Sequence, residues 1–115
     1  MKIPLNEFTG KARLAKKSDR YEVYDDLSLE NIVISMTVLH KDKSTTGHFH
    51  NDTEEIYFFV KGKGEIQLDD KKEDITRSDI VLIPRGIFHR VFNKGKGDLT
   101  FLCFFEKYQG RGSTT

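Results

Sequence analysis

The sequence is poor in cysteine, in net charge and in long hydrophobic runs, and each deficit excludes a class of protein. A single cysteine, Cys103, rules out an internal disulfide framework and suits a reducing cytoplasm. Lys and Arg total 19 and Asp and Glu total 18, so bulk electrostatics favour neither a nucleic-acid nor a membrane partner. No apolar run approaches a membrane-spanning length, and no apolar signal segment follows Met1. We therefore expect a soluble cytoplasmic protein.

The chain has the size of one small domain. Its 115 residues fall within the usual length of a single domain and allow an ordinary core. There is no internal repeat of solenoid length and no low-complexity linker. The polar, Gly-rich residues 109–115 are expected to fray. We predict one domain over residues 1–115.

Most of the chain has the pattern of short strands separated by turns. Turn signals occur at Gly62–Gly64, Asp69–Lys72 and Lys94–Asp98. Between them, alternating or β-branched segments predict strands over residues 31–39, 55–60, 65–68, 80–83, 88–92 and 99–105. Residues 18–29 and the basic stretch 11–20 could host a helix, but neither has an apolar stripe, and the basic stretch is expected to be a solvated face. This spacing indicates an all-β antiparallel sandwich or barrel.

Three of the four histidines fall where they can meet a carboxylate. His48 and His50 are two residues apart, so on an extended strand both imidazoles project from one face. Glu55 follows five residues later and shares a strand face with Tyr57. His89 comes just after a turn between two predicted strands. Three imidazoles and one carboxylate form a ligand set suited to a divalent transition metal.

The spacing of these residues resembles the two motifs of the cupin superfamily. Residues 47–62 match the first motif through His48, His50, Glu55 and Gly62. Residues 78–93 match the second motif through Pro84, Gly86, His89 and Asn93. One position departs from the pattern, because Ser78 stands where the second motif has glycine.

The resemblance implies both a fold and a metal centre. The fold would be the cupin double-stranded β-helix, a jelly-roll-like antiparallel β-barrel with the metal in its mouth. Its ligands would be His48, His50, Glu55 and His89, holding one divalent ion among Mn, Fe, Ni, Co, Cu or Zn. Glu54 is the competing carboxylate, although the spacing to Gly62 favours Glu55.

A finer likeness links the chain to archaeal cupin-type glucose-6-phosphate isomerases. It rests on Thr45-Thr46-Gly47-His48-Phe49-His50, on Glu55-Ile56-Tyr57 and on His89-Arg90-Val91-Phe92-Asn93. The resemblance implies that Thr45, Gly47 and Tyr57 contact a small sugar substrate, and Arg90 is a further candidate for an anionic group. Glu54 or Glu55 would then move a proton between adjacent carbons through an enediol.

Two other functions stay open, together with the oligomeric state. The same ligand set suits an Fe(II)-dependent dioxygenase, which an aromatic, mostly apolar pocket would favour. The third possibility is a non-catalytic cupin that binds a small molecule. An exposed sheet edge needs cover, so we expect a homodimer in which residues 1–9 or the strand 101–108 supplies it. Cys103 is expected to be inert core and His40 a surface residue.

Overall fold

The computed structural model describes residues 1–49 and 51–107, so His50 and the tail that was predicted to fray lie outside the described residues. Two short helical turns, η1 (Leu5–Glu7) and α1 (Phe8–Lys11), precede the strands. The strands are β1 (Arg13–Lys17), β2 (Tyr21–Asp26), β3 (Ile32–Leu39), β4 (Glu55–Lys61), β5 (Lys63–Leu68), β6 (Lys71–Thr76), β7 (Ile80–Ile83), β8 (His89–Asn93) and β9 (Leu99–Glu106). The all-β prediction is confirmed.

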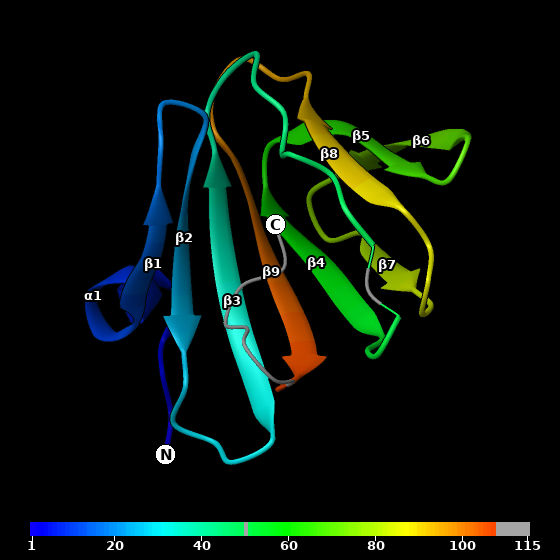
Figure 1. Cartoon of the computed structure of the whole chain (residues 1–115). Helices are drawn as coiled ribbons and strands as arrows, with labels where there is room; N and C mark the ends of the chain where they lie inside the picture. The colour runs from blue at the N-terminus through cyan, green and yellow to red at the C-terminus, as the bar shows by residue number, and fades with distance from the viewer. Residues whose placement is uncertain (50, 108–115) are drawn as a thin grey trace.

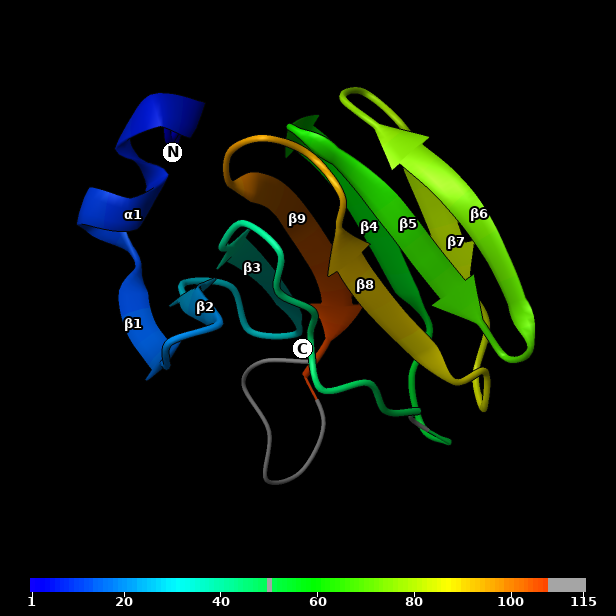
Figure 2. The same ribbon diagram turned by 90° about the horizontal axis from the view of Figure 1, so that it is seen from above.

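The strands form two antiparallel sheets that face each other (Figures 1 and 2). The larger sheet has the order β1-β2-β3-β9-β4-β7, and the smaller sheet has the order β6-β5-β8. β9 lies in the middle of the larger sheet, because it pairs with β3 on one side and with β4 on the other. Its hydrogen-bonding edges are therefore both used, and the expectation that the 101–108 strand covers a dimer edge is wrong for the described part of that strand.

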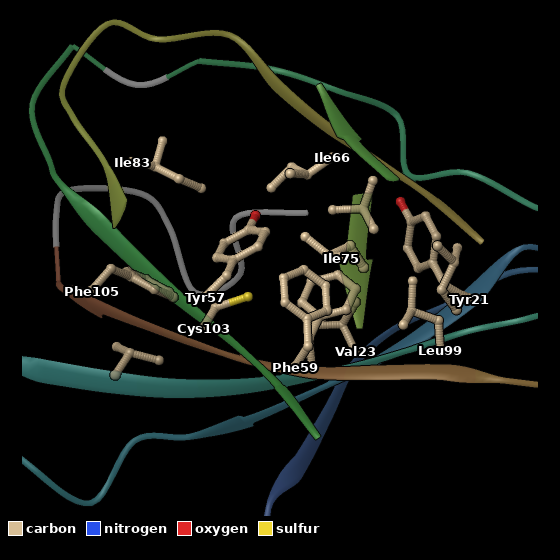
Figure 3. Close-up of a cluster of buried hydrophobic side chains, with 14 residues drawn as sticks. Tyr21, Val23, Tyr57, Phe59, Ile66, Ile75, Ile83, Leu99, Cys103 and Phe105 are labelled. Carbon is tan, nitrogen blue, oxygen red and sulfur yellow. The ribbon is translucent and has the colours of Figure 1, made fainter. Parts of the chain in front are cut away.

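Alternation of side-chain direction along the strands builds the core between the sheets. Inward positions of β2, β4, β8 and β9 are buried, while their neighbours point outward and are more exposed. Figure 3 shows Tyr57 and Cys103 rising from β4 and β9 into the space between the sheets. Tyr57 stacks on Phe101 with ring centroids 5.1 Å apart, and Cys103 is fully buried as predicted. These contacts place one face of β4 inside the barrel.

Three strands differ from the sequence prediction. β1 and β2 occupy segments that were considered solvated or helical, and β6 begins at Lys71 inside a predicted turn. β1 and β6 are edge strands with mostly exposed side chains, so they lack the hydrophobic pattern by which a strand is recognised. β6 instead forms through its full backbone pairing with β5, and the turn between them shrinks to Asp69 and Asp70.

His40 is more engaged than the predicted surface residue. Its Nδ1 lies 3.3 Å from Asp98 Oδ1, and its Nε2 lies 3.6 Å from Glu22 Oε2. The side chain is about one-third exposed. It thereby joins the end of β3 to β2 and to the loop before β9.

The outer face of the larger sheet is apolar and only partly covered. Phe8 of α1 packs there against Met36 and Leu102, so the N-terminal turns cover the part of the face near β3 and β9. Farther along, Ile80 and Leu82 of the edge strand β7 are 63% and 68% exposed. This uncovered edge bears on the oligomeric state.

Candidate metal centre

Glu55 is the first residue of β4, and its side chain lies on the same inward face of the strand as Tyr57 and Phe59. It lies opposite Ile83 of β7 and Phe105 of β9, and it is 3% exposed. Glu54 comes one residue earlier and is exposed. Because successive side chains of an extended chain alternate in direction, the two carboxylates differ sharply in burial. Only Glu55 faces the predicted histidine cluster.

His89 opens β8 from the opposite sheet. The preceding turn is closed by a hydrogen bond from the Ile87 N–H to the Pro84 carbonyl, with Gly86 at φ 77°. His89 Nδ1 lies 3.2 Å from the Ile87 carbonyl. A carbonyl oxygen can only accept, so Nδ1 carries a proton, and Nε2 is the ring nitrogen that faces Glu55.

His89 Nε2 lies 3.4 Å from Glu55 Oε1, and both side chains are almost completely buried. Without a proton or a cation between them, the Nε2 lone pair and an ionised carboxylate would repel each other at this distance. A shared proton or metal cation between them removes the repulsion, and a bound metal commonly has a histidine whose other ring nitrogen donates to a backbone carbonyl. The pair thus has the arrangement of two metal ligands.

His48 is tied to His89 through the backbone. The two residues exchange N–H to carbonyl hydrogen bonds of 3.1 and 2.9 Å, and their rings meet edge to face with centroids 4.9 Å apart. Gly47 makes this approach possible, since it has φ +83° and a Cβ there would lie 2.7 Å from Phe88 Cζ. Gly47 is thus required for the close approach of His48 to His89.

His89 therefore contacts two other predicted ligands, Glu55 and His48, which come from separate segments of the chain. Within residues 1–49 and 51–107, no group of three or more His, Cys, Asp or Glu side chains is arranged to hold a metal ion by itself. His50, the fourth predicted ligand, lies outside those residues. Imidazole nitrogens and a buried carboxylate are nevertheless the donors that a divalent transition metal selects, so the residues fit such an ion in kind.

Two of the predicted substrate contacts, Thr45 and Arg90, already make hydrogen bonds within the protein. The Thr45 hydroxyl accepts a 3.0 Å hydrogen bond from the Val91 N–H, and the residue is buried. Arg90 lies on the outer face of β8, opposite in direction to His89, and donates to the Thr45 carbonyl and to Ser44 Oγ at 2.9 Å. These contacts attach residues 44–48 to β8 and use the polar groups of both side chains.

Tyr57, another predicted substrate contact, lies beside His89. Its ring centroid is 5.7 Å from that of His89, nearly perpendicular to it. The residue is 1% exposed and is also part of the aromatic core. Tyr57 therefore joins the histidine cluster to the packed interior.

A family comparison agrees with the fold. Residues 35–105 match the model of the family described as "Cupin domain", which is more than half of the chain. The chain belongs to the cupin family. This cupin is 35% identical over 69 residues to an uncharacterized protein of Methanocaldococcus jannaschii, and 28% identical over 80 residues to one of Aquifex aeolicus. These matches cover 60% and 70% of the cupin but only 49% and 66% of the two relatives, so the chain spans about half to two-thirds of their length.

Solved structures share the fold at low sequence identity. A predicted oxalate decarboxylase from Thermotoga maritima aligns with a TM-score of 0.76 and 22% identity over 87% of this cupin and 96% of that chain. KdgF from Halomonas sp. aligns with a TM-score of 0.74 and 14% identity over 84% and 88% of the two chains. Oxalate decarboxylase of Bacillus subtilis matches with a TM-score of 0.75 and 19% identity over 85% of this cupin, but over only 29% of its own chain. These likenesses show the fold alone.

The structure also reveals buried polar side chains that the motifs do not contain. Asp25, Ser35 and Thr37 point inward from β2 and β3 and are at most 1% exposed. The alternation of Tyr21, Val23 and Asp25 was the available signal, but it carries information only once residues 21–26 are known to form a strand. No helix in the described part of this cupin is long and apolar enough to cross a membrane.

Proposed function

We propose that this cupin is an enzyme that uses one divalent transition metal to act on a small polar metabolite. His48, His50, Glu55 and His89 would hold the ion. The observation that carries the proposal is the buried contact of 3.4 Å between His89 and Glu55, with the ring of His48 edge-on to His89. A site of this kind costs folding free energy, which a bound cation offsets.

Each residue has a part that its position supports. The Ile87 carbonyl fixes the His89 ring, and the backbone pairing of His48 with His89 holds the two imidazoles together. Glu55 provides the inward carboxylate, whereas Glu54 is exposed. When bound, a divalent metal would polarise a carbonyl or hydroxyl oxygen of the ligand.

For the reaction itself, we propose a sugar-phosphate isomerase type. Such an enzyme moves a proton between neighbouring carbons, and a buried carboxylate is a suitable base. Of the two carboxylates considered for this role, the inward direction of Glu55 favours it over Glu54. The polar residues Asp25, Ser35 and Thr37 on the inner wall favour a hydroxylated substrate.

The Fe(II)-dependent dioxygenase is the second candidate. Phe59, Phe101 and Phe105 give one part of the interior the aromatic character that such a reaction favours. Other aromatic residues, such as Phe58 of β4 and Phe104 of β9, pack instead on the outer face of the larger sheet. A non-catalytic role remains the outcome if neither reaction is found.

The metal centre is tested with two neighbouring carboxylates. Glu55→Gln is expected to lower metal affinity by at least tenfold, because the variant loses an ionised ligand from the buried site. Glu54→Gln, its matched control, is expected to bind metal as the wild-type protein does. Metal content after dialysis against each divalent ion, measured by elemental analysis, provides the readout. Equal metal content in wild type and both variants would contradict the proposed ligand set.

The reaction is tested on the metal-loaded protein. Conversion of fructose 6-phosphate to glucose 6-phosphate, lost in Glu55→Gln and kept in Glu54→Gln, would support the isomerase. Oxygen consumption by the iron-loaded protein without isomerisation would favour the dioxygenase. Stoichiometric metal with neither activity would leave a metal-dependent binding protein.

We also propose that the protein works as a homodimer in the cytoplasm, without a nucleic-acid or membrane partner. The near-zero net charge and the single cysteine support the compartment and the partners. The uncovered edge strand β7, with Ile80 and Leu82 exposed, supports the dimer. Light scattering on a sizing column should give twice the 13.3 kDa chain mass, and Leu82→Glu should give the monomer. Leu14→Glu, on the other edge of the same sheet, is the control; a wild-type monomer at micromolar concentration would contradict the dimer.

A further inference from the structure

The inner wall of the barrel carries a second group of polar side chains, away from the histidines. Asp25 of β2 and both Ser35 and Thr37 of β3 are at most 1% exposed. Both carboxylate oxygens of Asp25 and the two hydroxyl oxygens have no hydrogen-bond partner within the described residues. Buried polar atoms are almost always satisfied, so four such atoms in one place require an explanation.

The pairing of the strands places these side chains together. Asp25 and Ser35 are direct partners in the β2–β3 ladder, so their Cβ atoms lie about 5 Å apart on the same face. Thr37 follows two residues after Ser35 and projects from that face, about 7 Å farther along the strand. The three side chains therefore form one cluster, which we call the Asp25 cluster.

The Asp25 cluster belongs to the same inner surface as the candidate metal centre. Ser35 lies opposite Cys103, and Cys103 lies opposite Tyr57, whose ring is 5.7 Å from that of His89. Three strand spacings separate Asp25 from Tyr57, or about 14 Å along the curved sheet. A ligand of several carbon atoms could reach both ends of this row.

Charge restricts what the cluster can hold. The buried charged residues of the described chain include the carboxylates of Asp25 and Glu55 but no Lys or Arg. One divalent cation at the histidines would balance the two carboxylates, since +2 − 2 = 0. An additional anionic group near Asp25 would be repelled, whereas hydroxyl groups can donate to its two oxygens without adding charge.

We propose that the Asp25 cluster is the second half of the ligand site and binds neighbouring hydroxyl groups of a polyhydroxylated ligand. The inference rests on the proposed function, because it extends the substrate contacts of the same barrel. Asp25 accepts two hydrogen bonds from adjacent hydroxyls, and Ser35 and Thr37 donate to or accept from the next oxygens. Any phosphate of the substrate therefore lies away from this end.

The first experiment measures binding of an uncharged open-chain hexitol, D-glucitol, to the metal-loaded protein by calorimetry. Wild type and Asp26→Asn should bind D-glucitol equally, and Asp25→Asn should bind it at least tenfold more weakly. Asp26 is the matched control because it is the next residue of β2, points outward and accepts hydrogen bonds from the Ser28 hydroxyl. The diol 1,6-hexanediol, which has no neighbouring hydroxyls, should give no heat.

Several results would overturn the proposal. No heat from D-glucitol with wild type, equal affinity in Asp25→Asn, or tighter binding of the diamine putrescine than of D-glucitol would each do so. If Asp25→Asn does not fold, Ser35→Ala replaces it. We then expect the affinity for D-glucitol to fall at least threefold, and an unchanged affinity would overturn the proposal.

The second experiment needs neither metal nor ligand. Asp25 has no hydrogen-bond partner among residues 1–49 and 51–107, so removing its buried charge should stabilise the ligand-free protein, and Asp25→Asn should raise the melting temperature by about 4 °C. A fall in melting temperature would show that the carboxylate has a structural role and would overturn the proposal. Metal content of the same samples separates the two proposals. Normal metal content together with an unchanged melting temperature in Asp25→Asn would refute only the role of the Asp25 cluster. Absence of metal in the wild-type protein would refute only the metal centre.

Discussion

The turn between β6 and β7 holds a non-glycine residue in a strained backbone conformation, and one substitution can test the cost of that strain. Ser78 has φ 78°, in the left-handed region, at the one motif position where the sequence departs from glycine. Its N–H donates to the Phe59 carbonyl at 2.7 Å, so the turn is held against β4. The Ser78 side chain is exposed. The hydrogen bond from the Ser78 N–H to Phe59 therefore requires the left-handed conformation, which glycine would adopt with less strain.

The expected gain follows from two opposing terms. A side chain in the left-handed region costs about 1–2 kcal/mol, which Ser78→Gly relieves. The added glycine costs about 0.5–1 kcal/mol through the greater freedom of the unfolded chain. The free energy of unfolding should thus rise by about 0.5–1 kcal/mol, or about 2–5 °C in melting temperature for a chain of this length.

The assay is urea and thermal unfolding followed by circular dichroism. Arg77→Gly is the control, because Arg77 is exposed in the same turn and is not among the residues with positive φ. That variant pays the entropic cost with no strain to relieve, so its stability should fall by about 0.4–1 kcal/mol. If Ser78→Gly and Arg77→Gly change stability in the same direction, the strain argument is refuted.

Two further predictions concern side chains that hold loops and strands in place. The buried Asn93 side chain donates hydrogen bonds to the Leu39 and Gly97 carbonyls and accepts one from the Gly95 N–H, all at 2.9 Å. Asn93→Ala should therefore lower the free energy of unfolding by about 3 kcal/mol, measured by urea unfolding. A loss below about 1 kcal/mol would contradict this role. The hydrogen bond from Tyr24 to Glu22, with burial and the Glu22 charge, raises the pKa of Tyr24 above 10.0. Because the folded pKa is raised, the stabilisation is complete below pH 10 and is lost as pH rises through the folded pKa. Unfolding measured above pH 10 should show a steeper loss in wild type than in Tyr24→Phe; equal slopes would contradict it.

The motif-bearing strands were predictable because their hydrophobic patterns and turns agree with each other. Ile80–Ile83 was placed within its exact bounds, and the strand that begins at Glu55 was placed to within one residue. β6 was not predicted, since Ile75 is its one buried side chain and backbone pairing with β5 across a two-residue turn creates it. The turn signal was present in the sequence, but an exposed edge strand has no hydrophobic alternation by which its length could be recognised.

The candidate site was predictable as far as spacing determines direction. Counting residues from Gly62 favoured Glu55 over Glu54, and the structure places Glu55 inside and leaves Glu54 exposed. Spacing could not show that the Thr45 hydroxyl and the Arg90 guanidinium are used by the fold, because their partners belong to distant segments. A motif records which residues recur together, but not whether a given side chain holds a ligand or the backbone.

The Asp25 cluster shows what is lost when a strand is missed. Asp25 and Asp26 are adjacent and chemically identical, and only the register of β2 against β3 determines which of them enters the barrel. The outward Asp26 accepts hydrogen bonds from Ser28, whereas the inward Asp25 and its neighbours have none within the described residues. A packed interior would be more stable with apolar residues there, so these buried oxygens oppose folding unless something binds them. The stability of Asp25→Asn therefore tests directly whether this half of the barrel was shaped by folding or by a ligand.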